Sequence, residues 1–248
     1  MKKIFFTLLF FLSMHHRGNS QPDIHINVNN TWNGENTLAV NPTDSNNLVV
    51  AWMKLNLFAV TIAVSHSSDG GQAWSEPVLM QHTQLGYTSA DPGITVDENG
   101  IFYLSFIDFS SLLTGGAVYV THSNDKGESW STAVEVINVN TSADQPVDRP
   151  WMTIDESNGI HHGRIYLVTK SYFAAAPPHA VWLMYSDDGG ATWSSPNQVD
   201  SIWKVGLLLN SMGVPTVGND GALYKSTDGG ASWSGSLQAV YIDGNADF

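Results

Sequence analysis

Short runs of β-branched, aromatic and alternating apolar residues recur along the chain, and turns rich in Asn, Asp and Gly separate them. In one group, residues 93–96 and 101–106 flank the turn at 97–100, and further runs follow at 117–121 and 133–137. Runs of this length and composition predict strands, and no segment shows a sustained helical period. The pattern therefore predicts an all-β chain built from four-stranded antiparallel meanders.

Each predicted group contains one copy of the pattern S-x-D-x-G-x-x-W, and the four copies start at residues 67, 123, 186 and 226. The Asp can accept hydrogen bonds from the backbone of its own turn, the Gly allows positive φ, and the Trp ring packs back onto the strands. We therefore interpret the repeat as a structural turn rather than a source of catalytic acids. Its Asp and Trp positions are Asp69, Trp74, Asp125, Trp130, Asp188, Trp193, Asp228 and Trp233.

These repeats resemble the Asp-box (BNR) repeats of sialidase-like and related glycosidase β-propellers. The phrases "NPTDSNNLVVAW" and "DRPWMTID" are also similar to secreted bacterial BNR proteins labelled as exo-sialidases or glycosyl hydrolases. In that family the box joins the third and fourth strands of each blade. The resemblance implies a β-propeller with a carbohydrate or glycoconjugate as its partner, and it divides the chain into units at about 32–84, 88–140, 146–201 and 210–243.

The repeats are unequally spaced. Successive copies start 56, 63 and 40 residues apart, so the fourth unit is compressed. Family propellers usually carry six blades, whereas this chain supplies about four. The chain is therefore either an unusually small closed propeller or an incomplete six-bladed ring, and the compressed unit favours the incomplete ring. Residues 23–28 alternate like a strand and could close a ring by pairing with the last blade.

The N-terminus has the composition of a secretory leader. Two lysines precede an apolar run at 4–12, which is too short to span a bilayer, and small residues follow at 18–20. We expect a signal peptide over 1–20, a propeller over 21–248, and a secreted, periplasmic or cell-surface protein without a membrane span. The net charge of −13 disfavours nucleic acid, and the absence of cysteine excludes disulfides and thiolate metal sites.

Superposing the units predicts a ring of side chains where the innermost strands begin, on the face opposite the boxes. Equivalent positions there hold Glu35, Asp91, Arg149 and Met212. The loops between the second and third strands open on the same face. The candidate catalytic residues are Glu35, Asp91, Asp108 and Tyr172, and the candidate substrate-binding residues are Arg149, Lys170 and Asp148.

A pair of these carboxylates could provide the acid and the nucleophile or base of glycoside hydrolysis, and a Tyr is the nucleophile of sialidases. Arg149 could hold a substrate carboxylate through two hydrogen bonds. The alternative is that the same residues only line a channel and pair with one another and with water, because a fold alone implies no function.

The chain departs from sialidases in its arginines. Those enzymes hold the sialic acid carboxylate with three arginines, the first in an Arg-Ile-Pro motif, whereas only Arg149 and Arg164 follow the leader here. We therefore do not expect true sialidase activity. The adjacent His161 and His162 would point to opposite faces of a strand, so neither a metal site nor a cofactor is expected. A glycan-binding or glycan-hydrolysing propeller and a non-enzymatic binding or scaffold propeller both remain open.

Overall fold

The computed structural model describes residues 25–26, 31–171, 181–200, 212–213 and 241–242, which form strands and no helix. The expected leader, Tyr172 and the fourth repeat with Asp228 and Trp233 lie outside these residues, and the expected strand at 23–28 is described only at His25 and Ile26. No helix long and apolar enough to cross a membrane occurs among the residues that the structure describes.

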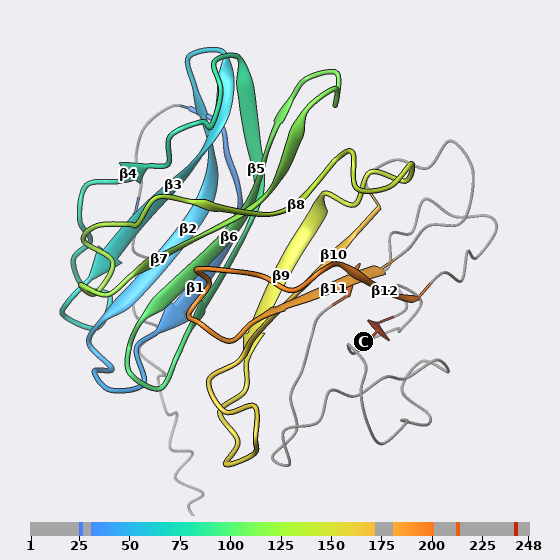
Figure 1. Ribbon diagram of the computed structural model, residues 1–248. Helices are drawn as coiled ribbons and strands as arrows, with labels where there is room; N and C mark the ends of the chain where they lie inside the picture. Colours follow the sequence, from blue (N-terminus) through green and yellow to red (C-terminus); the bar gives the residue numbers. More distant parts are fainter. Residues whose placement is uncertain (1–24, 27–30, 172–180, 201–211, 214–240, 243–248) are drawn as a thin grey trace, which may run out of the picture.

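Three antiparallel four-stranded sheets account for most of the described chain, and each follows chain order (Figure 1). The first sheet contains β1 (Asn33–Val40), β2 (Leu48–Asn56), β3 (Ala59–Ser67) and β4 (Val78–Leu79). The second contains β5 (Tyr87–Val96), β6 (Phe102–Ser110), β7 (Gly116–Ser123) and β8 (Val134–Asn138). The third contains β9 (Asp148–Ile154), β10 (Ile165–Lys170), β11 (Val181–Ser186) and β12 (Asn197–Asp200). In addition, β13 (Met212–Gly213) pairs antiparallel with β14 (Tyr241–Ile242). The predicted all-β class and its antiparallel four-stranded sheets are confirmed.

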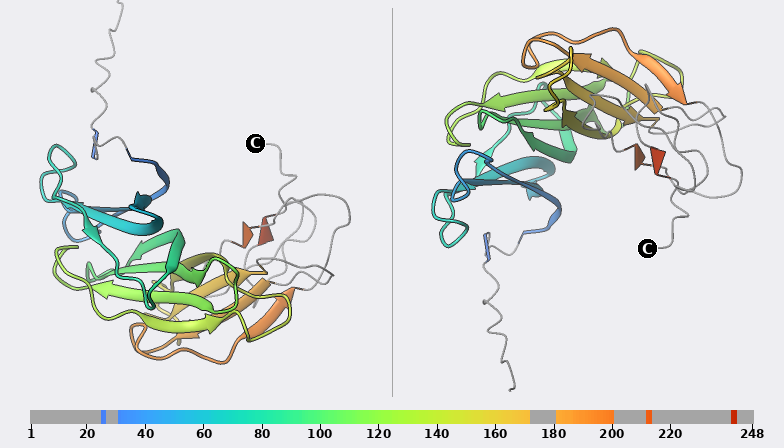
Figure 2. Two further views of the ribbon diagram at one scale, coloured as in Figure 1. Left: turned by 90° about the horizontal axis from the view of Figure 1, so that it is seen from above. Right: turned by 90° about the horizontal axis from the view of Figure 1, so that it is seen from below.

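The three sheets follow one another along an arc, with their first strands next to each other (Figure 2). β5 contacts both β1 and β9. The approach of β5 to β9 is close, because a Cβ on Gly93 would lie 2.8 Å from the carbonyl oxygen of Pro150. The Ser105 hydroxyl donates to the same Pro150 oxygen at 3.3 Å. The innermost strands of all three sheets are thus held side by side.

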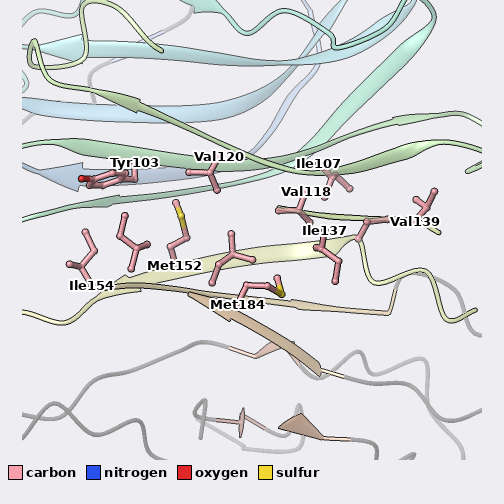
Figure 3. Close-up of a cluster of buried hydrophobic side chains, with 12 residues drawn as sticks. Tyr103, Ile107, Val118, Val120, Ile137, Val139, Met152, Ile154 and Met184 are labelled. Atoms are coloured by element: carbon pink, nitrogen blue, oxygen red, sulfur yellow. The ribbon is translucent and has the colours of Figure 1, made fainter. Parts of the chain in front are cut away.

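Apolar side chains fill the space between successive sheets, and the second sheet contributes to both layers. Phe102, Leu104 and Phe106 of β6 belong to the cluster shared with the first sheet. Tyr103 and Ile107 of the same strand pack against the third sheet (Figure 3). Side chains alternate between the two faces of a strand, so the nearly continuous apolar run of β6 is that of a strand buried on both faces.

The Asp of each described S-x-D-x-G-x-x-W turn accepts hydrogen bonds from groups of its own turn. In the first copy, one Asp69 carboxylate oxygen accepts hydrogen bonds from the Ser67 hydroxyl at 2.8 Å and from the Gln72 and Ala73 backbone N–H groups at 2.9 Å. The pKa of Asp69 is lowered, chiefly by the Ala73 N–H and the Ser67 hydroxyl. Hydrogen bonds from N–H and O–H groups stabilise the ionised form, which supports the interpretation of this Asp as part of a turn.

The second and third turns also pack against the preceding sheet. The Asn47 side-chain amide donates to the Lys126 carbonyl at 3.0 Å, and the Lys126 ammonium pairs with Asp44 at 2.8 Å. Trp130 packs against the cluster between the first two sheets, and Trp193 against the cluster between the second and third. The repeat therefore links neighbouring sheets in addition to closing its own hairpin.

The contact between the second turn and the first sheet can be tested at Gly127. Its φ is +91°, and an added Cβ would lie 2.6 Å from a methyl group of Val49. Gly127→Ala should lower the free energy of unfolding by about 2–5 kcal/mol, because it combines backbone strain with overpacking. Gly163→Ala is the matched control, since its φ is +82° with nothing within 4 Å, and it should cost only about 1–2 kcal/mol. Equal losses in chemical denaturation would contradict the inferred contact.

Candidate functional site

The innermost strand of each sheet loses its pairing register at the same place. The breaks lie between Gly34 and Thr37 in β1, between Ala90 and Gly93 in β5, and in β9 opposite the step from Val168 to Lys170. The residues in these bulges, all with positive φ, are Glu35 (+48°), Asp91 (+53°) and Arg149 (+50°).

Positive φ is uncommon outside glycine and is concentrated at functional sites, and bulges re-aim side chains. The three bulge residues are those that the superposed repeats placed at equivalent positions. The fourth of that set, Met212, begins β13, which contacts β10. The backbone therefore has the same irregular conformation where three successive innermost strands carry a charged residue.

Asp91 connects the three innermost strands. Its carboxylate accepts a hydrogen bond from the Arg149 backbone N–H at 3.1 Å. Its carboxyl group also interacts with the carboxyl groups of Glu35, which raises the pKa of Asp91, and of Asp148, which lowers it. The contact therefore brings together three acids from three sheets.

Burial makes two of these acids, Asp91 and Asp148, harder to ionise than ordinary aspartates. The pKa of Asp91 is raised, first by burial and next by its interaction with Glu35, while the Arg149 N–H opposes the shift. Burial also raises the pKa of Asp148 to about 6, against the lowering effect of Lys170. Lys170 and Asp148 form an ion pair that is almost fully buried. Within this cluster of Glu35, Asp91, Asp148 and Lys170, Asp91 and Asp148 therefore hold their protons to higher pH than ordinary aspartates do.

Asp108 lies in a separate buried network. Its fully buried carboxylate accepts hydrogen bonds from His82 Nδ1 at 2.8 Å, from both the backbone N–H and the hydroxyl of Thr83 at 2.7 Å, and from the Ser89 hydroxyl at 3.0 Å. These contacts fix the connection between β4 and β5. None of them reaches the carboxylate cluster, so the structure separates Asp108 from the other predicted acids.

A second buried acid, Asp144, lies in the connection from β8 to β9. The Ser171 hydroxyl and the Trp182 indole N–H, at 3.2 Å, both donate to one of its carboxylate oxygens. Sequence reasoning missed both His82 and Asp144. The signal that could have found them is a comparison of the connections between units, at 80–86 and 139–147, rather than of the strands alone.

The two arginines among the described residues lie at opposite ends of the sheets. Arg149 is in the β9 bulge, whereas Arg164, at the start of β10, pairs with Asp187 at 2.7 and 2.9 Å and lies 4.0 Å from the centre of the Tyr185 ring. His162 bonds to Glu98 at 2.9 Å across two sheets. Within the described ranges, no group of three or more His, Asp or Glu side chains could hold a metal ion.

The pKa of Asp148 tests the electrostatics of the cluster. We expect its labelled carboxyl carbon to titrate near pH 6 by NMR, because burial outweighs the effect of Lys170. Lys170→Met should raise this pKa further, since the substitution removes the positive charge that lowers it. Asp69, whose pKa is set by its own turn, is the control and should not change. A titration of Asp148 below its ordinary 3.8 would contradict the described burial.

No known protein-family model matches the chain. It is similar to a sialidase from Paraclostridium sordellii, with 25% identity over 202 residues that cover 70% of this chain and 49% of that protein. It is also similar to a xyloglucanase from Paenibacillus sp, with 25% identity over 180 residues that cover 66% and 16% of the two proteins. The chain thus spans about half the length of the first relative and a smaller share of the second.

Solved structures show the same architecture. A protein of unknown function from Dyadobacter fermentans DSM 18053 superposes with a TM-score of 0.59 at 17% identity, covering 86% of this chain and 69% of that one. The intramolecular trans-sialidase from Ruminococcus gnavus superposes with a TM-score of 0.55 at 14% identity, covering 85% and 71%. At such identities the likeness is one of fold, and the chain has a sialidase-like fold.

Proposed function

We propose that the chain binds glycans and hydrolyses a glycosidic bond at the Glu35–Asp91–Asp148 cluster. The observation that carries this proposal is the contact of Asp91 with carboxyl groups from two neighbouring sheets at equivalent backbone bulges. Glycoside hydrolysis uses one protonated and one ionised carboxyl group, about 5–9.5 Å apart, on the two sides of the scissile bond. Similarity to proteins named a sialidase and a xyloglucanase supports a glycan as the substrate.

In this proposal Asp91 holds the proton that is transferred to the leaving-group oxygen, because its raised pKa keeps it protonated at higher pH than an ordinary Asp. Glu35 is exposed and serves as the nucleophile or base, with Tyr172 as the alternative nucleophile. Lys170 and Asp148 position Asp91, and Arg149 binds the substrate. Asp108 has no part in the reaction, because His82, Thr83 and Ser89 occupy its carboxylate.

The proposal includes the finer architecture that the repeats predict. Residues 1–20 would direct export, and the units at 32–84, 88–140, 146–201 and 210–243 would be Asp-box blades of a propeller. The arc of three sheets and the sialidase-like fold support this arrangement.

A non-enzymatic glycan-binding propeller is the second candidate function. The observation that favours it is the placement of Arg149 and Arg164 at opposite ends of the sheets, where they cannot act together on a substrate carboxylate. In that case the interactions within the carboxylate cluster would stabilise the innermost strands. The surface around the cluster would recognise a sugar without cleaving it.

Asp91→Asn tests the catalytic role on a panel of aryl glycosides. An Asn cannot donate the carboxyl proton, so kcat on any hydrolysed substrate should fall by about 10²- to 10⁴-fold. Asp69→Asn, at the opposite end, is the matched control and should leave kcat unchanged. Hydrolysis unaffected by Asp91→Asn would remove Asp91 from the reaction, and glycan binding without any hydrolysis would favour the second candidate.

A further inference from the structure

The two ends of the sheets differ sharply in charge. The connections that the structure describes at the end with the bulges are residues 57–58, 80–86, 111–115 and 139–147. They contain no Lys or Arg, and their only acidic residue is the buried Asp144, so the charges at this end lie in the strands and not in these connections. The turns at the opposite end are strongly acidic, with Asp44, Asp69, Asp97, Glu98, Asp125, Glu128, Asp155, Glu156, Asp187 and Asp188. In a chain with a net charge of −13, a set of connections without exposed acidic residues is a distinct surface.

Large apolar side chains project from these connections. Leu57 and Phe58 form the tip of the β2–β3 hairpin and are 85% and 100% exposed, and Leu112 at the β6–β7 tip is 82% exposed. Leu85, in the connection from β4 to β5, is fully exposed. Both hairpin tips lie at the top of Figure 1. We call Leu57, Phe58, Leu85 and Leu112 the apolar rim.

Contacts between the connections place the rim around the beginning of β5. The Thr88 hydroxyl bonds to the backbone N and O of Val60, at 3.1 and 3.3 Å, which brings the β2–β3 hairpin next to the β4–β5 connection. Tyr87 pairs with Ser110 at the base of the β6–β7 hairpin. Asp91 lies four residues farther along the same strand. The apolar rim and the carboxylate cluster therefore occupy the same end.

Single exposed apolar residues are ordinary, but four on neighbouring connections that carry no exposed charge indicate an interaction surface. Separate tips with uncharged polar residues between them suit a fluid apolar phase, into which each tip can insert independently. Leu and Phe favour the boundary between lipid headgroups and acyl chains, whereas acidic groups stay in water. The distribution of acidic residues orients the molecule with its opposite end away from such a boundary.

We propose that the end bearing the apolar rim docks on a zwitterionic lipid surface, with Leu57, Phe58, Leu85 and Leu112 inserted at the headgroup boundary. The net charge of −13 opposes binding to anionic lipids, so the neutral surface is the preferred one. This docking does not depend on the proposed catalysis. Where both hold, the carboxylate cluster faces lipid-linked glycans rather than soluble ones.

The chain contains no cysteine, so single labelling sites can be introduced without background. Leu112→Cys and Ile160→Cys, each labelled with an environment-sensitive fluorophore, are mixed with phosphatidylcholine vesicles. Ile160 is the matched control, because it is 95% exposed but lies in the acidic turns. The probe at 112 should shift to the blue and brighten, and the probe at 160 should not. Both labelled proteins carry the same residues 1–20. The comparison therefore reports insertion at the labelled site even if those residues bind the vesicles.

Adding Leu57→Ser and Phe58→Ser to the protein labelled at 112 should lower its partition coefficient by at least about tenfold, because two inserted side chains are lost. Phosphatidylserine in the vesicles should weaken the response. Equal responses at 112 and 160, or none at 112, would overturn the proposal. The same fluorescence change at 112 in the absence of vesicles, produced by raising the protein concentration alone, would also overturn the proposal. It would assign the rim to a contact with a second copy of the chain.

Discussion

The positive-φ bulge in each innermost strand is the constraint on which the site depends. Strained residues of this kind cost of the order of 1–3 kcal/mol each, and the packed clusters between the sheets offset that cost. The bulge moves Glu35, Asp91 and Arg149 out of the regular alternation of their strands. It also presents the Arg149 backbone N–H to the Asp91 carboxylate. The Asp91 side chain of β5 therefore contacts both β1, through Glu35, and β9, through Arg149.

Structural and chemical roles are divided between the two ends of the sheets. At one end, the Asp of each described box turn accepts hydrogen bonds from the backbone of its own turn, and the second turn packs against the preceding sheet through the contact of Asn47 with Lys126. At the other end, acids from different sheets meet, and burial raises the pKa of Asp91 and of Asp148. The same residue type therefore has a lowered pKa at Asp69 and a raised pKa at Asp91, because their surroundings differ.

Local patterns were enough to predict the strands, the antiparallel sheets and the equivalence of Glu35, Asp91 and Arg149, because each depends on residues close together in the sequence. The separation of Asp108 from Asp91 was not predictable. It depends on His82 and Thr83, which reach Asp108 from a connection 25 or more residues away. The contact of Asp91 with Asp148 likewise depends on how closely two sheets approach, which no local pattern encodes.

The pKa of Asp91, followed by NMR of its labelled carboxyl carbon, tests the central claim most directly. If Asp91 is buried beside the Glu35 carboxylate, it titrates above its ordinary value of 3.8, and Glu35→Gln moves the titration to lower pH. The substitution removes a neighbouring negative charge while keeping the size of the side chain. An Asp91 that titrates at or below 3.8, or one that is indifferent to Glu35→Gln, would contradict the account.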